Sequence, residues 1–307
     1  MTNLKKIGLT ALAGSLAVTG FAQAGDLSVN GTARMEYQST KATATTAADT
    51  FAQTASITFS GSGELDNGNT VSFTSVRTGA ATTSQSVTLD MGDMGAVSIA
   101  SANLAGIGTI QDMVPNGGEQ PWDDLGTHGS PQQGVASPHA GNRLGYSNTM
   151  GGAIVSAAIN YEQNSPTTSI AIQLPNLVEG LNIGAGIATD ASAAGVEDDI
   201  ETMYVKYAMG SVSVGYQTTD VDVTAATSDI ERTSYGISFS VNDNLSIGYG
   251  VSDTEFEAQT LDEENTGIGI AYTSGGMKLG IINNTKDNEA GTAGTTEMTE
   301  FQLTFAF

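Results

Sequence analysis

The chain has 307 residues and a formal net charge of −23, with 33 acidic residues, 10 basic residues and no cysteine. An acidic chain without a basic stripe has nothing to offer nucleic-acid phosphates, so a DNA- or RNA-binding protein is excluded. The lack of cysteine excludes disulfides and thiol chemistry.

The first 24 residues have the layout of a secretory signal peptide. Lys5 and Lys6 form a positive n-region, an apolar run extends from Ile7 to Val18, and Ala22-Gln23-Ala24 is a small-residue cleavage site. The apolar run is too short to span a bilayer. We therefore expect residues 1–24 to be removed and residues 25–307 to form one domain, with 8 basic and 33 acidic residues and a formal charge of −25.

After the signal peptide, apolar and polar residues alternate with the period of two that is typical of β-strands. In the last segment, for example, Phe301, Leu303 and Phe305 fall on one face, and Gln302 and Thr304 fall on the other. The alternation slips after Phe73, so the direction of Arg77 is left open. The pattern predicts sixteen strands, near 27–38, 54–65, 70–78, 84–91, 96–101, 142–148, 153–162, 167–174, 181–189, 202–208, 212–218, 231–241, 245–253, 265–273, 277–284 and 296–307.

The connections between these segments alternate between short and long. Short turns rich in Gly and Asn, such as Asp66-Asn67-Gly68-Asn69, are followed by longer polar connections. The long set is expected at 39–53, 190–201, 219–230, 254–264 and 285–295, together with a very long loop at about 101–141. A membrane barrel separates its connections in this way, with short turns on the periplasmic side and longer loops outside. A loop as long as 101–141 can fold into a wide lumen.

The two strand faces favour a membrane barrel with a wet interior. One face carries Ile, Val, Leu and Tyr without Lys or Arg at the confidently assigned mid-strand positions, and a cation there would cost roughly 2–4 kcal/mol at the bilayer midplane. The other face is rich in Ser, Thr, Gly, Asn and Gln, whose hydroxyls and amides would cost roughly 1–3 kcal/mol each if they were buried without partners. Sixteen strands leave an aqueous channel. The expected fold is all-β, a 16-stranded antiparallel transmembrane barrel with a long constriction loop folded inward.

Charged residues of the long loop and of the inward strand face form the candidate constriction. The loop carries Asp112, Glu119, Asp123 and Asp124. The inward wall carries Arg34, Arg143, Lys206 and Arg232, and Lys278 has the same inward parity. Carboxylates that face cations across a narrow lumen set ion selectivity. The alternative is that some of these acids lie near the outer mouth and only keep the loop hydrated. No catalytic residues are expected.

The chain resembles the trimeric general-diffusion porins of Gram-negative bacteria, most closely the alpha-proteobacterial kind. The resemblance extends over 25–307 and is carried by the signal peptide, the strand layout, the long loop after the fifth strand, and Asn142-Arg143-Leu144-Gly145-Tyr146-Ser147 where the chain leaves that loop. Phe305-Ala306-Phe307 is similar to the terminal aromatic signal for outer-membrane insertion, which assigns that role to Phe305 and Phe307. The resemblance implies a homotrimer, and we expect its contact on outward faces near the two chain ends, including Ala55, Phe59, Phe301 and Phe305.

These observations predict an outer-membrane porin for passive diffusion of ions and small hydrophilic solutes, with a weak preference for cations. The alternatives are a substrate-selective channel of the sugar type, a secreted all-β adhesin, and a barrel enzyme. The expected partners are outer-membrane lipid and lipopolysaccharide, and no cofactor is expected. Ca²⁺ at Glu197-Asp198-Asp199 and Asp262-Glu263-Glu264, placed in external loops, is a further possibility, against the simpler interpretation of solvated acidic loops.

Overall fold

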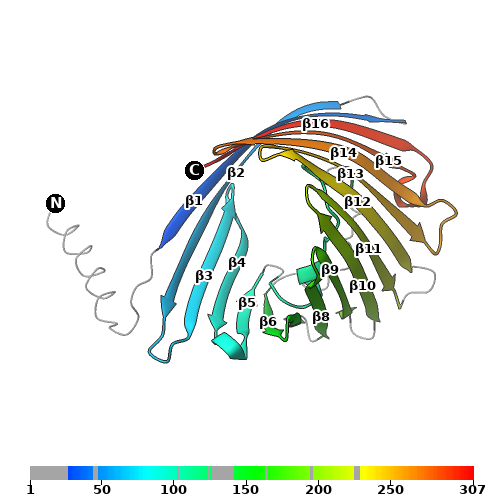
Figure 1. Cartoon of the computed structure of the whole chain (residues 1–307). Helices are drawn as coiled ribbons and strands as arrows, with labels where there is room; N and C mark the ends of the chain where they lie inside the picture. Colours follow the sequence, from blue (N-terminus) through cyan, green and yellow to red (C-terminus); the bar gives the residue numbers. More distant parts are fainter. Residues whose placement is uncertain are drawn as a thin grey trace, which may run out of the picture.

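The described strands form one closed antiparallel barrel in a computed structural model that describes residues 27–43, 48–101, 104–123, 125, 142–162, 165–193, 196–224 and 229–307 (Figure 1). The expected signal peptide, 1–24, lies outside these residues. The strands are β1 (Ser28–Ala42), β2 (Ala48–Glu64), β3 (Thr70–Thr78), β4 (Ala81–Asp90), β5 (Ala96–Ala100), β6 (Arg143–Met150), β7 (Ala153–Glu162), β8 (Ser165–Val178), β9 (Leu181–Ala193), β10 (Val196–Met209), β11 (Val212–Asp222), β12 (Ile230–Asn242), β13 (Leu245–Phe256), β14 (Glu263–Ser274), β15 (Met277–Asp287) and β16 (Thr295–Ala306). Among the described residues, no helix is long and apolar enough to cross a membrane.

The barrel closes where the first strand meets the last. Strand β1 pairs with β16 from Thr32 opposite Ala306 to Ala42 opposite Thr296. The chain end completes this seam, because the backbone of Phe307 exchanges hydrogen bonds of 3.2 and 2.8 Å with that of Gly31. No strand edge is left unpaired at the seam, which a lipid environment requires.

All sixteen predicted strands are present, and several are longer than expected. The predicted long connections at 39–53, 190–201, 219–230, 254–264 and 285–295 are wrong in length, because strand residues occupy most of each and leave 43–47, 194–195, 223–229, 257–262 and 288–294. A ladder of backbone hydrogen bonds does not depend on apolar side chains. Polar residues therefore continue each hairpin beyond the apolar segment that predicted it.

The predicted alternation of faces is confirmed. Ile170, Tyr235 and Ile268 are 46, 49 and 47% exposed on one face, whereas Ser234 and Ser252 are fully buried on the other, with their hydroxyl oxygens 2.9 Å apart. Arg77 is paired with Ile57, which is 46% exposed, so Arg77 lies on the outer face. The register shift between Val76 and Arg77 explains why the sequence pattern slips there.

The described part of the long loop lies inside the curve of the sheet, close to β8–β12 (Figure 1). It contains the 3-10 helix η2 (Gly106–Ile110). The face of the strands that this segment contacts is therefore the inner face.

Side chains of the wall bind the backbone of this loop. The hydroxyls of Ser156 on β7 and Ser169 on β8 accept hydrogen bonds from the N–H groups of Gly106 (2.8 Å) and Ile107 (3.1 Å). Gln217 on β11 donates to the carbonyl of Ile110 (2.8 Å) and accepts from the N–H of Met113 (2.9 Å). A buried loop without regular structure would otherwise leave these backbone groups unsatisfied.

Apolar contacts fix the same segment. Ile107 and Ile110 are fully buried against Ala171, Ala188, Ile200 and Tyr204 of β8–β10. Burying each isoleucine side chain contributes roughly 1.5–3 kcal/mol. The loop and the inner wall of β8–β10 therefore form a small hydrophobic core between them.

Glycines of the wall make room for the loop beyond η2. A Cβ on Gly248 of β13 would overlap the backbone of Gly117, and one on Gly215 of β11 would overlap the ring of Pro115. Gly269 on β14 differs, because the nearest loop atom would lie 3.5 Å from its Cβ, an ordinary contact. The loop follows a track that these glycines leave open.

We predict that Gly248→Ala destabilises the protein and that the neighbouring Gly269→Ala does not. The new methyl group at Gly248 must displace the loop backbone, and overpacking of this kind costs roughly 1–3 kcal/mol. Thermal unfolding of the detergent-solubilised protein, followed by circular dichroism, measures the difference. Equal unfolding temperatures for the two variants would contradict the docking of the loop at Gly248.

Candidate functional site

One group of polar residues joins the loop to the seam of the barrel. Gln302 on β16 donates a hydrogen bond to the Glu119 carboxylate of the loop. Gln302 lies directly opposite Glu36 on β1, and Glu36 forms a 2.8 Å ion pair with Arg34. Lys278 on β15 donates to the carbonyl of Gly118 (3.4 Å). We call Arg34, Glu36, Glu119, Lys278 and Gln302 the seam cluster.

The ion pair in the seam cluster changes the role expected for Arg34. The Arg34 and Glu36 side chains are 35 and 10% exposed, so both reach water while they neutralise each other. At about 4 Å two opposite unit charges attract by only roughly 1 kcal/mol in bulk water, and more where water is partly excluded. Arg34 therefore contributes little net charge to the lumen unless Glu36 is removed.

The other described acids of the loop are held around Gln120. The side-chain amide of Gln120 donates to Asp112, and its backbone N–H lies 3.4 Å from an Asp123 oxygen. The carbonyl of Gln120 accepts a 3.1 Å hydrogen bond from Asn284 on β15. Asp112 and Asp123 thus stay on the loop beside the inner wall, whereas Asp124 lies outside the described residues.

Three of the predicted wall cations do not join the seam cluster. Arg143, the first residue of β6, and Arg232 on β12 are only 4 and 2% exposed. Their inward parity is as predicted, but a passing solute cannot contact them. Lys206 on β10 is half-buried, opposite Gly215 and Asn182, on the wall that carries the loop.

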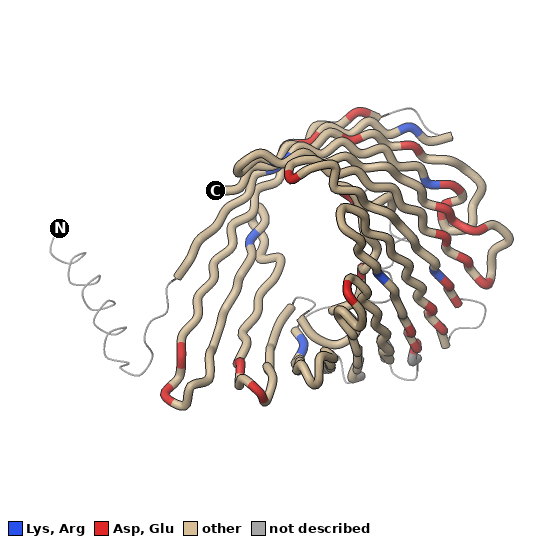
Figure 2. Tube along the Cα trace, viewed as in Figure 1, with Lys and Arg blue, Asp and Glu red and all other residues tan. Residues whose placement is uncertain are grey.

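Burial divides the inner wall into two halves. Most inward polar residues of β11–β16 are covered; Gln217, Thr219, Arg232, Ser252, Thr254, Asn265, Asn284 and Glu300 are all 2% exposed or less, whereas Ser240 and Lys278 beside the short turns are exposed. The inward residues of β1–β4, such as Thr58 and Thr74, are partly exposed. Figure 2 shows few charged positions along β1–β4. Open space inside the barrel therefore borders β1–β4.

The acidic clusters assigned to external loops lie mainly in strands. Asp198 and Asp199 belong to β10, and Glu263 and Glu264 belong to β14. Glu263 is fully buried on the inner face, where it accepts a 2.8 Å hydrogen bond from the N–H of Ala290 in the 3-10 helix η4 (Glu289–Gly291). The prediction that these residues lie in external loops is wrong except for Asp262, which precedes β14, because strand pairing continues through the other polar residues.

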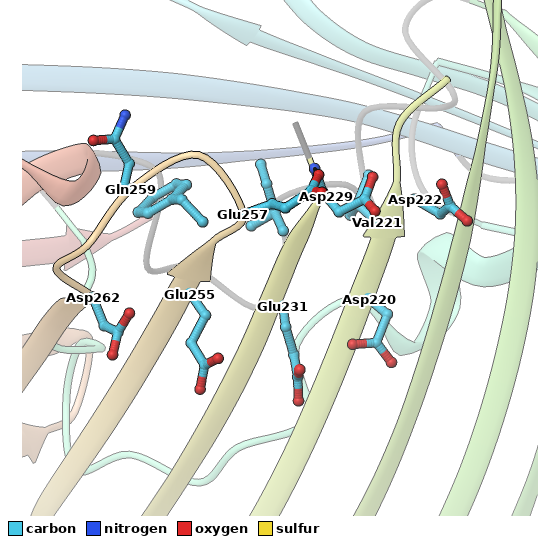
Figure 3. Close-up of a pocket in the computed structure, with 11 residues that line it drawn as sticks. Asp220, Val221, Asp222, Asp229, Glu231, Glu255, Glu257, Gln259 and Asp262 are labelled. Atoms are coloured by element: carbon cyan, nitrogen blue, oxygen red, sulfur yellow. Dashed lines mark hydrogen bonds between the residues drawn. The ribbon is translucent and has the colours of Figure 1, made fainter. Parts of the chain in front are cut away.

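The outer face carries a second acidic row. Asp220, Glu231 and Glu255 are direct cross-strand neighbours on β11–β13, and they line a hollow of about 410 Å³ with Asp262 (Figure 3). Glu231 has the strand parity of the exposed Tyr235, so this row faces away from the lumen. Like charges directly opposite one another destabilise a sheet. No group of three His, Cys, Asp or Glu side chains suited to a metal ion occurs among the residues that are described.

Sequence reasoning missed Glu36, Gln302, Gln120 and Gln217. Glu36 shares the inward parity of Arg34 two residues away, and that signal alone would have suggested an ion pair on one face. No sequence pattern singles out the three glutamines. Inward amides such as Gln217 and Gln302 are common in a water-filled barrel, and Gln120 lies in a loop without a regular pattern. Their partners lie between 3 and 183 positions away in the chain.

The terminal aromatic residues lie at the seam. Phe305 is paired with Ala33 on β1 and Met277 on β15, and the Phe307 side chain is exposed. Their proposed part in membrane insertion stays a prediction.

Comparison with known proteins gives one family and many structures of the same fold. The family model for the Gram-negative porin matches residues 8–288. A porin structure refined at 1.8 Å resolution has a TM-score of 0.65 at 16% identity and covers 92% of this chain and 100% of its own. The trimer form of in-vitro folded OmpT, an outer-membrane protein of Vibrio cholerae, has a TM-score of 0.69 at 12% identity, with 93 and 100% coverage. Salmonella typhi OmpF in complex with daunomycin has a TM-score of 0.69 at 12% identity, with 92 and 98% coverage. No curated protein matches the chain.

Because the sequence identities to these solved structures are low, the structures show only the fold. The match to the family model shows the family. The closed sixteen-stranded barrel, its polar inner face and its apolar outer face agree with that assignment. The chain belongs to the Gram-negative porin family and is an outer-membrane β-barrel channel for passive diffusion.

Proposed function

We propose that this porin is a general-diffusion channel for ions and small hydrophilic solutes with a weak preference for cations. The observation that carries the proposal is the Arg34–Glu36 ion pair. It neutralises the described mid-strand cation of the open wall, while Asp112, Glu119 and Asp123 are placed on the loop. The residual charge along the passage is therefore negative.

The preference should be weak for two reasons. At physiological ionic strength the Debye length is roughly 8 Å, so the distant acids of the strand ends are screened. Near the passage, hydrogen bonds from Gln302 and Gln120 hold Glu119 and Asp112, and Lys278 lies close to Gly118. In a wide, water-filled passage, one net charge on the protein interacts with an ion about 4 Å away by only about 1 kcal/mol.

The burial of Tyr204 argues against a substrate-selective channel of the sugar type. Such a channel would need aromatic side chains exposed along the lumen, and Tyr204 on β10 is an aromatic residue with inward parity. It is 5% exposed and packs in the core with Ile107 and Ile110. An adhesin has no need of a polar inner wall. We propose no enzymatic role for this porin.

Homotrimer assembly is part of the proposal, and the outer face of β3 and β4 supports it. Ser75 and Gln85 are direct neighbours on this face, joined by a 3.4 Å hydrogen bond, and Ser75 lies opposite Phe59 on β2. Amide and hydroxyl groups facing lipid would be costly. A neighbouring subunit would cover them, and one structure similar to this chain is described as a trimer form.

The remaining partners stay predictions. Outer-membrane lipid would contact the apolar outer faces of β7–β15, and lipopolysaccharide would meet the outer strand ends. Ca²⁺ at the outer acidic residues would relieve like-charge repulsion. The alpha-proteobacterial kind also stays a prediction.

We predict opposite shifts in selectivity when the two members of the ion pair are changed. Glu36→Gln leaves Arg34 as a free cation and should move the cation-to-anion permeability ratio toward anions, about two- to fivefold. Arg34→Gln should move it toward cations, and the double variant should return close to the parent. Reversal potentials in a KCl gradient across a planar bilayer measure these shifts. Glu231→Gln on the outer face is the control, and a Glu36→Gln variant that matches the parent would refute the proposal.

We predict that the parent protein cross-links as a trimer in mild detergent and that Ser75→Lys/Gln85→Lys lowers the trimer yield. Two buried cations without partners would destabilise the contact. Asp220→Lys on the outer face of β11 is the control and should cross-link like the parent. A parent protein that is monomeric by both cross-linking and analytical ultracentrifugation would overturn the assembly.

A further inference from the structure

The inner face of β1–β4 is a wall of hydroxyl groups. Direct cross-strand pairing places four hydroxyls in one row, Ser28, Ser60, Thr74 and Ser86. A second row runs through Ser62, Ser72, Thr88 and Ser98 from β2 to β5. Other inward positions of these strands are Thr32, Thr40, Thr50, Thr54, Ser56, Thr58, Thr70, Thr78 and Ser84.

These hydroxyls are available to a solute. Those of β2–β4 are half-buried or exposed, whereas most inward polar residues of β11–β16 are buried. Some already bond one another, with 2.9 Å between the oxygens of Ser28 and Ser60 and 3.0 Å between those of Ser56 and Thr78. A hydroxyl is both donor and acceptor, so each can still exchange a bond with a passing group.

The same wall offers almost no net charge. Within the described residues of β1–β4, the inner face carries one charged pair midway along the strands, Arg34 with Glu36, and these two are joined to each other. Glu64 and Asp90 lie at strand ends beside the turns, where Asp90 accepts a 2.9 Å hydrogen bond from the N–H of Gly92. The open wall therefore lacks a row of cations opposite the acids of the loop.

The geometry points to small uncharged polyhydroxyl solutes, of the size of simple sugars, as the class that this channel passes in preference to zwitterions of the same size. This inference rests on the proposed diffusion channel and names its favoured cargo. A polyol that gives up water beside β1–β4 regains hydrogen bonds from the hydroxyl rows, nearly one for one.

A zwitterion does not gain the same compensation. Its ammonium and carboxylate groups lose strong hydration in a narrow passage, and neutral hydroxyls replace only part of it. A separated pair of charged walls would orient such a dipole. Arg143 and Arg232 on the loop-bearing wall are buried. The half-buried Lys206 and the exposed Lys278 on that wall face no row of carboxylates on the described strands β1–β4. The neutral wall thus favours the polyol.

The test compares swelling rates of proteoliposomes in a pentose and in glutamine, two solutes of similar mass. The parent should admit the pentose several-fold faster. The triple variant Thr54→Val/Thr58→Val/Thr74→Val keeps the side-chain volume and removes three partly exposed hydroxyls, so the pentose-to-glutamine ratio should fall about two- to tenfold. Its conductance in KCl should stay close to the parent value, because no charge changes.

Two further variants serve as a control and as a replacement. Thr218→Val/Thr233→Val makes the same change at paired positions on the outer face and should leave the ratio unchanged. Thr58→Val alone replaces the triple variant if that variant does not fold, with a smaller fall in the ratio. A parent protein without conductance would overturn the diffusion channel itself. Normal conductance with a parent ratio near one, or a ratio that the Thr→Val changes leave intact, would overturn only the polyol preference.

Discussion

The structure depends on how the inner wall satisfies the backbone of the long loop. A barrel of sixteen strands encloses more space than side chains alone can fill, and a chain segment that enters this space must find partners for its N–H and C=O groups. Ser156, Ser169, Gln217 and Asn284 supply these partners from β7, β8, β11 and β15. Gly215 and Gly248 let the segment approach closely. The path of the loop is therefore fixed by the side chains and glycines of the wall, and the loop in turn buries those side chains.

Docking the loop on one side makes the two halves of the lumen chemically different. The covered half holds buried charges and amides, among them Arg232 and Glu263. The open half keeps partly exposed hydroxyls and the Arg34–Glu36 pair. Because the seam cluster ties Glu119 to β16, the part of the loop around Glu119 lies where the covered half meets the open half. Selectivity then follows from residues at this boundary and not from the total charge of the chain.

The strands could be predicted from the sequence because a period of two is a local property. The longer strand ends could not, since segments that do not alternate, such as Asp49-Thr50-Phe51, join the ladder only when a partner strand is in register. Parity placed Arg232 on the inner face correctly, but its burial depends on long-range contacts around it. The partners of the loop were equally hidden, because Gln217 and Ile110 are 107 positions apart. Glu36 alone could have been found, from its shared face with Arg34.

The loop covers much of the β11–β16 wall and leaves β1–β4 wet, and because the chain has no cysteine, this arrangement can be tested directly. Single variants Thr58→Cys on β2 and Ala271→Cys on β14, where Ala271 lies beside Gly118 of the loop, are treated with a water-soluble thiol reagent in the assembled, membrane-embedded protein. We predict that Thr58→Cys reacts at least about tenfold faster, since labelling of the buried Ala271 site requires local opening. Equal rates at the two positions would contradict it.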